Sequence, residues 1–218
     1  MAGCNERGGK PDLVNGKTLF VAKCGACHTL ARANTKGTQG PNLDAAFSEA
    51  RAQGFKDSGI EGVVHSQIGH VRRGSIMPNN IYKGDDARDV AAYVGFAAAN
   101  PGKDSGDLAA AGQPKTSNKP AVEKNGTLTI PADPSGALAF QFNKANAKAG
   151  QVTLEMPNKS GITHDISIKG NGVNQQGPRV GQGGTSKVSV NLKPGTYTFY
   201  CSVPGHEAGG MKGTLTVK

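Results

Sequence analysis

Residues 199–213 read FYCSVPGHEAGGMKG and place a cysteine, a histidine and a methionine at equal intervals. Four residues separate Cys201 from His206, and four more separate His206 from Met211. This spacing fits neither a disulfide nor a zinc knuckle. A thiolate, an imidazole and a thioether on one short loop suit a soft or borderline metal ion. Such an ion needs one more ligand from elsewhere in the chain.

The second half of the chain contains one further histidine, His164, in the strand-like run GITHDISIKG. Two imidazoles and a thiolate in a trigonal arrangement, with a long axial thioether, are the ligands of a type 1 blue-copper site. We therefore expect His164, Cys201, His206 and Met211 to bind one copper ion. The alternative interpretation combines a lone buried thiol, two surface histidines and a core methionine, and it needs all four to coincide.

Residues 125–218 contain short runs rich in β-branched and aromatic residues, several of them alternating with polar ones. The runs are TLTI, ALAFQF, VTLEM, ITHDISIK, KVSVNL, YTFYC and GTLTV. Seven strands in about 94 residues predict an all-β antiparallel Greek-key sandwich. A sandwich of this kind would form the ligand cage before a metal binds, so the metal would change its geometry little when its oxidation state changes.

The run KCGACHTL in the first half contains Cys24, Cys27 and His28 as a CxxCH motif. Two thiols three positions apart can add to the two vinyl groups of one haem, and the following histidine then lies beneath the iron. A CxxC pair alone is also compatible with a redox disulfide or half of a zinc site. The histidine directly after it favours one covalently bound haem c.

Met77 is the candidate for the other axial position of the haem iron. It lies in RRGSIMPNN, 49 residues after His28 and just before the acidic start of a predicted helix. A methionine thioether favours ferrous iron and raises the reduction potential. The alternative is a methionine buried in the protein core. With Met77 as ligand, both axial positions are filled.

Two further histidines, His65 and His70, lie between these motifs. They could replace Met77 on the iron, or bind a haem propionate together with Arg72 or Arg73. The interpretation we favour is that both are solvent-exposed helix residues, because His28 and Met77 already complete the iron coordination.

The first domain, residues 12–100, is predicted to be all-α. Its helical segments are LVNGKTLFVAKC, with Asn15 as the expected N-cap, IEGVVHSQIGHVRRG and GDDARDVAAYVGFAAA. Residues 101–124 are rich in Pro, Gly, Ser and Lys, which predicts a flexible linker. About twenty flexible residues have an r.m.s. span of about 25 Å, so the two domains could meet or separate.

Residues 12–100 resemble the class I c-type cytochromes. The resemblance rests on the CxxCH motif, Gly16 and Phe20 one turn apart before it, GPNL at 40–43, the SIMP loop and Tyr93 on the last helix. It implies that Pro41 and its loop lie against the histidine side of the haem. It also implies that Phe20 packs against the last helix near Tyr93.

Residues 125–218 resemble the cupredoxins. The Cys-x4-His-x4-Met spacing and YCSVPGHEAGGMKGTLTV are most similar to auracyanin-like members, with plastocyanin and halocyanin as relatives. Asp165 stands where this family often has an asparagine that ties the two ligand loops together. The resemblance implies a hydrogen bond between Asp165 and the Ser202 hydroxyl. Pro204 would remove one backbone donor near the thiolate, which tends to raise the copper potential.

The formal net charge of the 218-residue chain is +9, without a basic tract of the kind that binds nucleic acid. The charge therefore suggests attraction to acidic protein surfaces. The sequence contains no run of eighteen apolar residues, so no membrane-spanning helix is predicted. Residues 1–11 are expected to be an N-terminal tether, because Ala2-Gly3-Cys4 matches the end of a bacterial lipoprotein cleavage box. Cys4 would then carry a lipid; the alternative is an unmodified cysteine in a tail.

These features together predict an electron-transfer protein rather than an enzyme. It would relay single electrons between redox partners on the periplasmic face of the cytoplasmic membrane, from a quinol-oxidising complex or another donor to a terminal oxidase, reaction centre or reductase. One alternative is a haem and copper redox enzyme resembling nitrite reductase, but that chemistry needs a second copper held by three histidines. Another alternative is a haem-based sensor, which needs an open or displaceable iron ligand.

Overall fold

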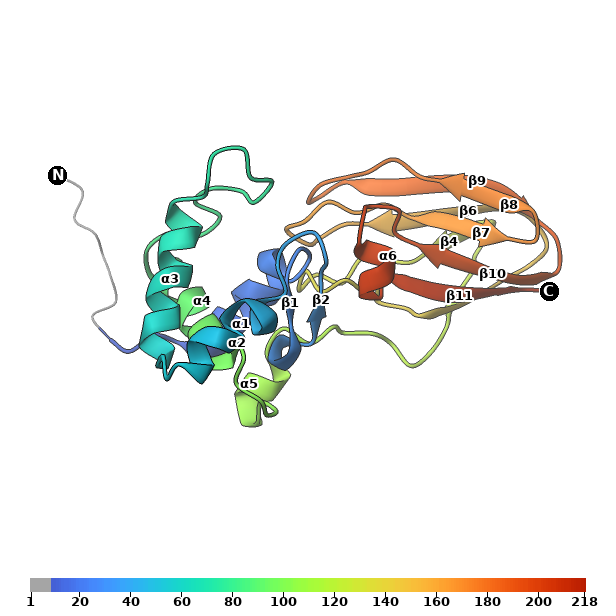
Figure 1. Cartoon of the computed structure of the whole chain (residues 1–218). Helices are drawn as coiled ribbons and strands as arrows, with labels where there is room; N and C mark the ends of the chain where they lie inside the picture. The colour runs from blue at the N-terminus through green and yellow to red at the C-terminus, as the bar shows by residue number, and fades with distance from the viewer. Residues whose placement is uncertain (1–8) are drawn as a thin grey trace. The chain divides into compact units, whose positions relative to one another are not determined.

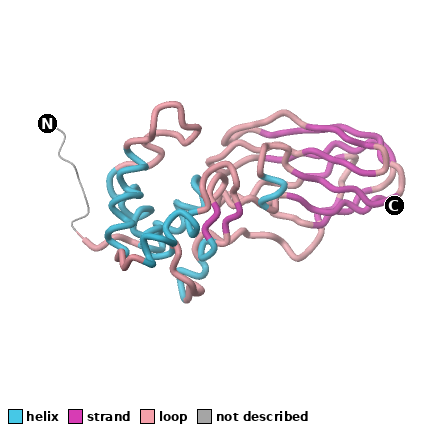
Figure 2. The backbone as a smooth tube through the Cα atoms, in the orientation of Figure 1, coloured by secondary structure: helices cyan, strands magenta, loops and turns pink. Residues whose placement is uncertain are grey.

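The computed structural model describes residues 9–218, which form two compact units divided between Gln113 and Pro114. Figure 1 shows the chain coloured from blue at the N-terminus to red at the C-terminus, through the first unit and then the second. Helices predominate in the first unit and strands in the second, as Figure 2 shows. This confirms the predicted order of an all-α domain followed by an all-β domain. Cys4 and the expected lipid attachment lie outside the described residues. Within the described part of the chain, no helix is both long and apolar enough to span a bilayer.

The first unit is built from five α-helices and a small two-stranded ladder among the described residues. The helices are α1 (Leu13–Leu19), α2 (Leu43–Ala52), α3 (Asp57–Gly69), α4 (Gly84–Ala97) and α5 (Gly106–Ala110). A π-helical turn (Phe20–Cys24) continues α1, and the ladder pairs β1 (Thr29–Leu30) with β2 (Thr35–Lys36) around a 3₁₀ turn (Ala31–Ala33).

Helix α1 begins one residue after Asp12, whose carboxylate accepts hydrogen bonds from the backbone N–H groups of Val14 and Asn15. An N-cap side chain satisfies donors that have no partner inside the helix. The prediction that Asn15 caps this helix is therefore wrong. The Asn15 amide instead donates to Asp89 on α4 at 2.9 Å, which is a contact that local sequence patterns do not reveal.

The core of the first unit lies where α1 crosses α4. A side chain at Gly16 would collide with the backbone carbonyl of Asp89, so only glycine allows this close approach. One turn later, the Phe20 ring lies with its centroid 6.3 Å from that of Tyr93, and both residues are buried. The packing of Phe20 against the last helix near Tyr93 is thus confirmed. The packing of α1 on α4 therefore holds in place the helix that continues directly into the CxxCH motif.

The second unit is a sandwich of a six-stranded sheet, ordered β3-β5-β11-β10-β7-β8, and a three-stranded sheet, ordered β4-β6-β9. The strands are β3 (Ala121–Val122), β4 (Thr127–Thr129), β5 (Lys144–Ala147), β6 (Gly150–Pro157), β7 (Ser167–Gly170), β8 (Val173–Gln176), β9 (Thr185–Leu192), β10 (Gly195–Tyr200) and β11 (Lys212–Val217). One short helix, α6 (His206–Gly209), interrupts the connection between β10 and β11.

The pairing in this sandwich is mixed. The pairs β3–β5, β5–β11 and β4–β6 are parallel, whereas the remaining pairs are antiparallel. The predicted sandwich is confirmed, and each of its parallel pairs involves one of the N-terminal strands β3, β4 and β5. Strand β4 is followed by about fourteen residues before β5 begins, and such a long connection can carry the chain from one sheet to the other.

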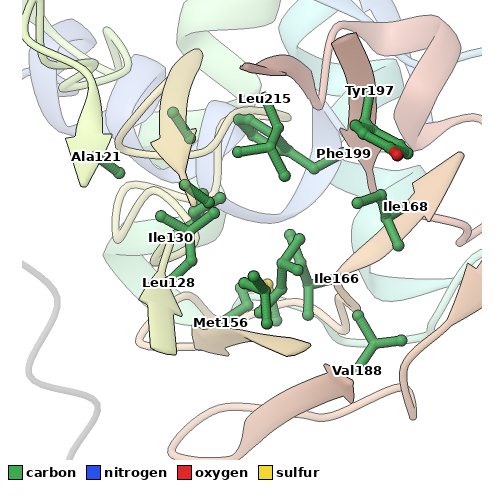
Figure 3. Packing of buried hydrophobic residues seen from close by; sticks show 14 of the residues in the cluster. Ala121, Leu128, Ile130, Met156, Ile166, Ile168, Val188, Tyr197, Phe199 and Leu215 are labelled. Atoms are coloured by element: carbon green, nitrogen blue, oxygen red, sulfur yellow. The ribbon is translucent and has the colours of Figure 1, made fainter. Parts of the chain in front are cut away.

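The core of the second unit fills the space between the two sheets, as Figure 3 shows. Side chains alternate between buried and exposed along β9, as expected for strands with one face on the core. The rings of Phe140 and Phe199 meet edge to face with centroids 5.4 Å apart. Cys201 and Met211 belong to the same buried cluster. The loop of residues 201–211, called the ligand loop below, is therefore continuous with the hydrophobic core.

The segment 101–124 differs from the flexible linker that its composition predicts. Helix α5 and strand β3 both lie in this range, and the division between the two units falls inside it. The Asp104 side chain is only 2 % exposed and forms ion pairs with the first unit. Composition alone misses this, because a single buried carboxylate fixes a segment that has almost no large apolar side chains.

Candidate metal centres

Three of the four predicted copper ligands converge in the second unit. The Nδ1 atoms of His164 and His206 lie 3.2 Å apart. Cys201 Sγ lies 3.4 Å from His206 Nδ1 and 3.9 Å from His164 Nδ1. A point equidistant from these three atoms is about 2 Å from each, the distance at which an imidazole nitrogen binds a zinc ion. The three atoms therefore fit a single metal ion of this size.

The ligand loop begins where β10 ends. Cys201 directly follows that strand, His206 is the first residue of α6, and Met211 directly precedes β11. The Cys201 N–H donates to the Met211 carbonyl at 3.1 Å, and the Met211 N–H donates to the His206 carbonyl at 2.9 Å. These bonds close the loop on itself. Met211 is fully buried, so its thioether is part of the same enclosed region.

His164 comes from a different part of the sandwich. Its backbone exchanges two hydrogen bonds with Val180, which places it in a short bridge just before β7. The ring stands edge to face with that of His206, with centroids 5.1 Å apart. A cage made from two separate connections is held by the strands on either side. Its shape therefore does not depend on a bound ion.

Burial sets the protonation states of this cage. It lowers the pKa of His164 to about 3, with the neighbouring His206 adding to the effect, and it lowers the pKa of His206 to about 4. Both rings are thus neutral near pH 7 and offer lone pairs to a metal. Burial also raises the pKa of the Cys201 thiol to about 11. A bound cation is the group that stabilises the thiolate in such a site.

Asp165 forms hydrogen bonds that connect the residues around the cage. Its carboxylate accepts hydrogen bonds from the Ser202 N–H at 2.8 Å and from the Ser202 hydroxyl at 2.6 Å. The Ser167 hydroxyl donates to it at 2.9 Å, and the Asp165 N–H points at Cys201 Sγ at 3.4 Å. The expected bond between Asp165 and Ser202 is confirmed. It joins the connection that carries His164 to the one that carries Cys201.

In the first unit, Cys24, Cys27, His28 and Met77 line one cavity of about 460 Å³. Most other lining side chains are apolar, among them Phe20, Leu43, Phe47, Ile68, Ile81 and Val94. Cys24 and Cys27 form no disulfide. A mostly apolar cavity with two thiols and an imidazole on its wall fits a covalently attached haem.

The imidazole of His28 is oriented by the next loop. His28 Nδ1 lies 2.9 Å from the Pro41 carbonyl, which can only accept, so Nδ1 donates and Nε2 is left for a metal. A Cβ atom at Gly40 would lie 2.5 Å from the ring, so glycine permits this approach. The expectation that Pro41 and its loop lie on the histidine side is confirmed.

The structure also identifies a neighbour of Met77 that sequence reasoning missed. The amide nitrogen of Gln67 on α3 lies 3.9 Å from Met77 Sδ, within reach of a weak hydrogen bond to sulfur. A polar residue among the apolar positions of that helix face was the available signal. His65 and His70 are exposed and do not line the cavity, in agreement with their interpretation as surface residues.

The folds and the two ligand sets define a redox chain that joins a c-type cytochrome domain to a blue-copper domain. Residues 13–95 match the family model of cytochrome c. Residues 129–218 match the model described as copper binding proteins of the plastocyanin/azurin family. The chain therefore carries a cytochrome c domain followed by a cupredoxin domain. Their cofactors are haem c and type 1 copper.

Two curated relatives each match a little under half of this chain. Rusticyanin from Acidithiobacillus ferrooxidans is 33 % identical over 103 residues, which cover 44 % of this chain and 63 % of rusticyanin. A second rusticyanin from that species is 32 % identical over 98 residues, which cover 44 % of this chain and 52 % of the relative. The match thus spans only between about half and two thirds of these relatives.

Among solved structures, reduced auracyanin from Roseiflexus castenholzii is 26 % identical. That similarity covers 44 % of this chain and 99 % of the auracyanin, with a TM-score of 0.39. Auracyanin B is also 26 % identical, over 48 % of this chain and 94 % of that one, with a TM-score of 0.39.

Proposed function

We propose that this chain is an electron carrier with two one-electron centres, one in each unit. His28 and Met77 bind the iron of a haem attached through Cys24 and Cys27. His164, Cys201, His206 and Met211 bind the copper. The observation that supports this most directly is the mutual spacing of 3.2–3.9 Å among the ligating atoms of the two histidines and the cysteine. These atoms are held by strands and hydrogen bonds that need no metal.

At the copper site, this chain's residues keep the surroundings fixed and dry. Copper, when bound, supplies a one-electron couple. His164, Cys201 and Met211 are fully buried, so water has no access from their side. His206 is the one ligand with measurable exposure, at 6 %. We infer that electrons enter or leave this unit at the surface around His206.

At the haem site, Cys24, Cys27, His28 and Met77 line the cavity and would hold the group and ligate its iron. Cys24 and Cys27 attach it, the Pro41 carbonyl orients His28, and Gln67 lies beside the sulfur of Met77. If His28 and Met77 both ligate the iron, as we propose, no position would be open for a substrate. This supports an electron carrier over a haem enzyme or a gas sensor.

The ligand count argues in the same direction. A nitrite-reductase-like enzyme needs an additional copper held by three histidines. Within the described residues, the one cluster of potential metal-binding His, Cys, Asp and Glu side chains is His164, Cys201 and His206. His65 and His70 are exposed on the helical unit and provide only two imidazoles.

The partners that we propose are redox proteins outside the cytoplasm. Covalent haem attachment and copper loading both take place there in bacteria, and Cys4 would tether the native chain to the membrane. A quinol-oxidising complex would donate electrons, and a terminal oxidase, reaction centre or reductase would accept them. The formal charge of +9 suits acidic docking surfaces on these proteins.

An anaerobic optical redox titration of the copper-loaded protein tests this function. The haem bands and the blue thiolate-to-copper band are followed together, and carbon monoxide is then added to the reduced sample. We expect two reversible one-electron transitions and haem bands that carbon monoxide does not shift. A haem that binds carbon monoxide, or a protein that never turns blue, would contradict the proposal.

A further inference from the structure

The segment after α4 is anchored to the first unit by one buried carboxylate. Asp104 forms ion pairs with Lys17 and Arg32, both at 2.9 Å, and accepts a hydrogen bond from the Tyr93 hydroxyl at 3.0 Å. Lys17, at 1 % exposure, and Asp104, at 2 %, are both withdrawn from water. Removing one partner of such a buried ion pair strongly destabilises the fold, so this contact holds the segment firmly on the first unit.

The chain remains packed against the first unit for the eight residues that follow Asp104. The Lys17 ammonium also donates to the Leu108 carbonyl at 2.7 Å, which secures α5. Ala111 is buried. Gly112, at φ +65°, packs so closely on α1 and the following turn that a Cβ atom there would lie 2.6 Å from Val21. The first unit therefore holds the chain as far as Gly112.

The chain begins to form hydrogen bonds with the second unit at Lys115. The Lys115 N–H donates to the fully buried Asp133 carboxylate at 2.6 Å. The Ser117 N–H donates to the Gln141 carbonyl at 2.7 Å, and Ser117 forms a bridge with Phe142. The free part of the connection thus lies between Gly112 and Lys115.

We propose that Gln113 and Pro114 are a short hinge, and that the two units reorient about it while Gly112 and Lys115 stay close together. Three Cα–Cα steps join Gly112 to Lys115, which limits their separation to about 11 Å. Pro114 fixes its own φ angle and restricts the residue before it, so few torsions remain free. Asp104 and Asp133 are the two anchors that make the connection short. Without them, 24 residues of linker composition would lie between the units.

The consequence for electron transfer rests on the proposed function. A two-residue connection keeps each centre at a high effective concentration near the other, so exchange between them would not depend on protein concentration. Releasing the Asp104 anchor would free residues 105–112 and so lengthen the connection by eight residues. The Asp104 contact therefore determines how far the two units can move apart.

Hydrogen–deuterium exchange on the full chain with both cofactors tests the hinge without relying on electron transfer. We expect slow exchange at the amides of Ala109, Ala111, Lys115 and Ser117, which all donate within one unit. Exchange at the rate of a free peptide throughout 101–124 would overturn the proposal. The result is independent of whether the centres exchange electrons, so it cannot be confused with failure of the proposed function.

Asp104→Asn provides the variant, with Asp107→Asn as its matched control, because Asp107 is an exposed carboxylate in the same segment. We expect exchange in 105–112 to accelerate at least tenfold in the first variant and not in the second, with 115–117 unchanged in both. If the Asp104→Asn protein loses its haem spectrum, Tyr93→Phe is the variant to use instead, because it removes only one hydrogen bond to the same carboxylate. Unchanged exchange in the folded variant would overturn the role of Asp104.

Discussion

Asp165 and Ser202 are joined by two hydrogen bonds, from the Ser202 N–H at 2.8 Å and from its hydroxyl at 2.6 Å. Each residue directly follows a residue that we propose as a copper ligand, His164 in one case and Cys201 in the other. The pair therefore fixes the separation between two ligands that come from different connections of the sandwich. Because Asp165 is fully buried, its carboxylate also acts on the copper site as a charge.

Replacement of Asp165 by Asn should raise the copper reduction potential. The Asp165 carboxylate only accepts hydrogen bonds, and the Arg179 guanidinium lies 4.0 Å from it, so it carries a negative charge that favours the more positive Cu(II) state. Removing that charge should stabilise Cu(I) by about 1–3 kcal/mol at the dielectric of a protein site. Spectroelectrochemistry on the blue band measures this. Ser202→Ala keeps the charge and loses one bond, so its potential should move less; equal shifts in both variants would exclude the charge as the cause.

Replacement of Cys201 by Ser should abolish the intense blue band and leave the haem spectrum unchanged. The band requires a thiolate on copper, and a hydroxyl does not provide one. Absorption spectroscopy of copper-loaded protein checks this, with Ser202→Ala as the control that keeps its colour. A blue band that persists in Cys201→Ser would remove Cys201 from the site.

Replacement of Met77 by Ala should open one axial position of the haem. The reduced variant should then bind carbon monoxide, while the copper spectrum stays the same. The neighbouring Gln67→Ala is the matched control, because Gln67 contacts the Met77 sulfur without occupying the axial position that we assign to it. If Met77→Ala excludes carbon monoxide as the native protein does, Met77 is not the ligand.

Replacement of Asp104 by Asn should destabilise the first unit by about 3 kcal/mol at pH 7, because Lys17 and Arg32 would keep their charges but lose the carboxylate that balances them. Burial of Asp104 opposes ionisation, but hydrogen bonds from Lys17, Arg32 and Tyr93 outweigh it and hold its pKa below the ordinary value. A lowered carboxylate pKa contributes stability above the unfolded pKa of about 3.9, and this is lost as the pH falls through the folded pKa.

The difference between native and Asp104→Asn protein should therefore be constant from pH 7 to about pH 5 and shrink below about pH 4. Denaturant unfolding, followed through the haem absorption at several pH values, gives this difference. A difference that stays constant down to pH 3 would contradict the assignment of the ion pairs.

Replacement of Gly16 by Ala should destabilise the first unit by about 1–3 kcal/mol or more, because the new methyl group meets the rigid Asp89 backbone. Gly62→Ala is the matched control on α3, where a Cβ atom meets nothing within 4 Å. Alanine there should stabilise the helix by about 0.5–1 kcal/mol. Thermal unfolding of both variants makes the comparison. Equal effects would mean that the approach of α1 to α4 is not tight at Gly16.

The sequence was most informative where ligand chemistry imposes a local pattern. The CxxCH motif and the spacing of Cys201, His206 and Met211 are each contained in fewer than a dozen residues, so tertiary structure was not needed to notice them. His164 was identified by elimination, because the strand-rich half of the chain has only two histidines. The structure places its Nδ1 atom beside His206 Nδ1 and Cys201 Sγ.

The sequence was least informative where a contact joins distant residues. Asn15 looked like a helix cap, but its amide pairs with Asp89, 74 positions later. The parallel pairing of β4 with β6 depends on where a long connection returns, and strand composition is the same for either direction. Gln67 lies beside Met77 only because α3 and the following loop turn back on each other.

By itself, the sequence determined the two fold classes, the order of the domains and the residue types that can bind haem and copper. These follow from hydrophobic periodicity and from ligand preferences, which are properties of short segments. Only the tertiary structure decided the spacing of the proposed copper ligands, the hydrogen bonds of Asp165 to Cys201 and Ser202, and the anchoring of the chain on either side of Gln113 and Pro114. Each depends on a buried polar group finding a partner many residues away, and the cost of burying it unpaired makes that partner essential.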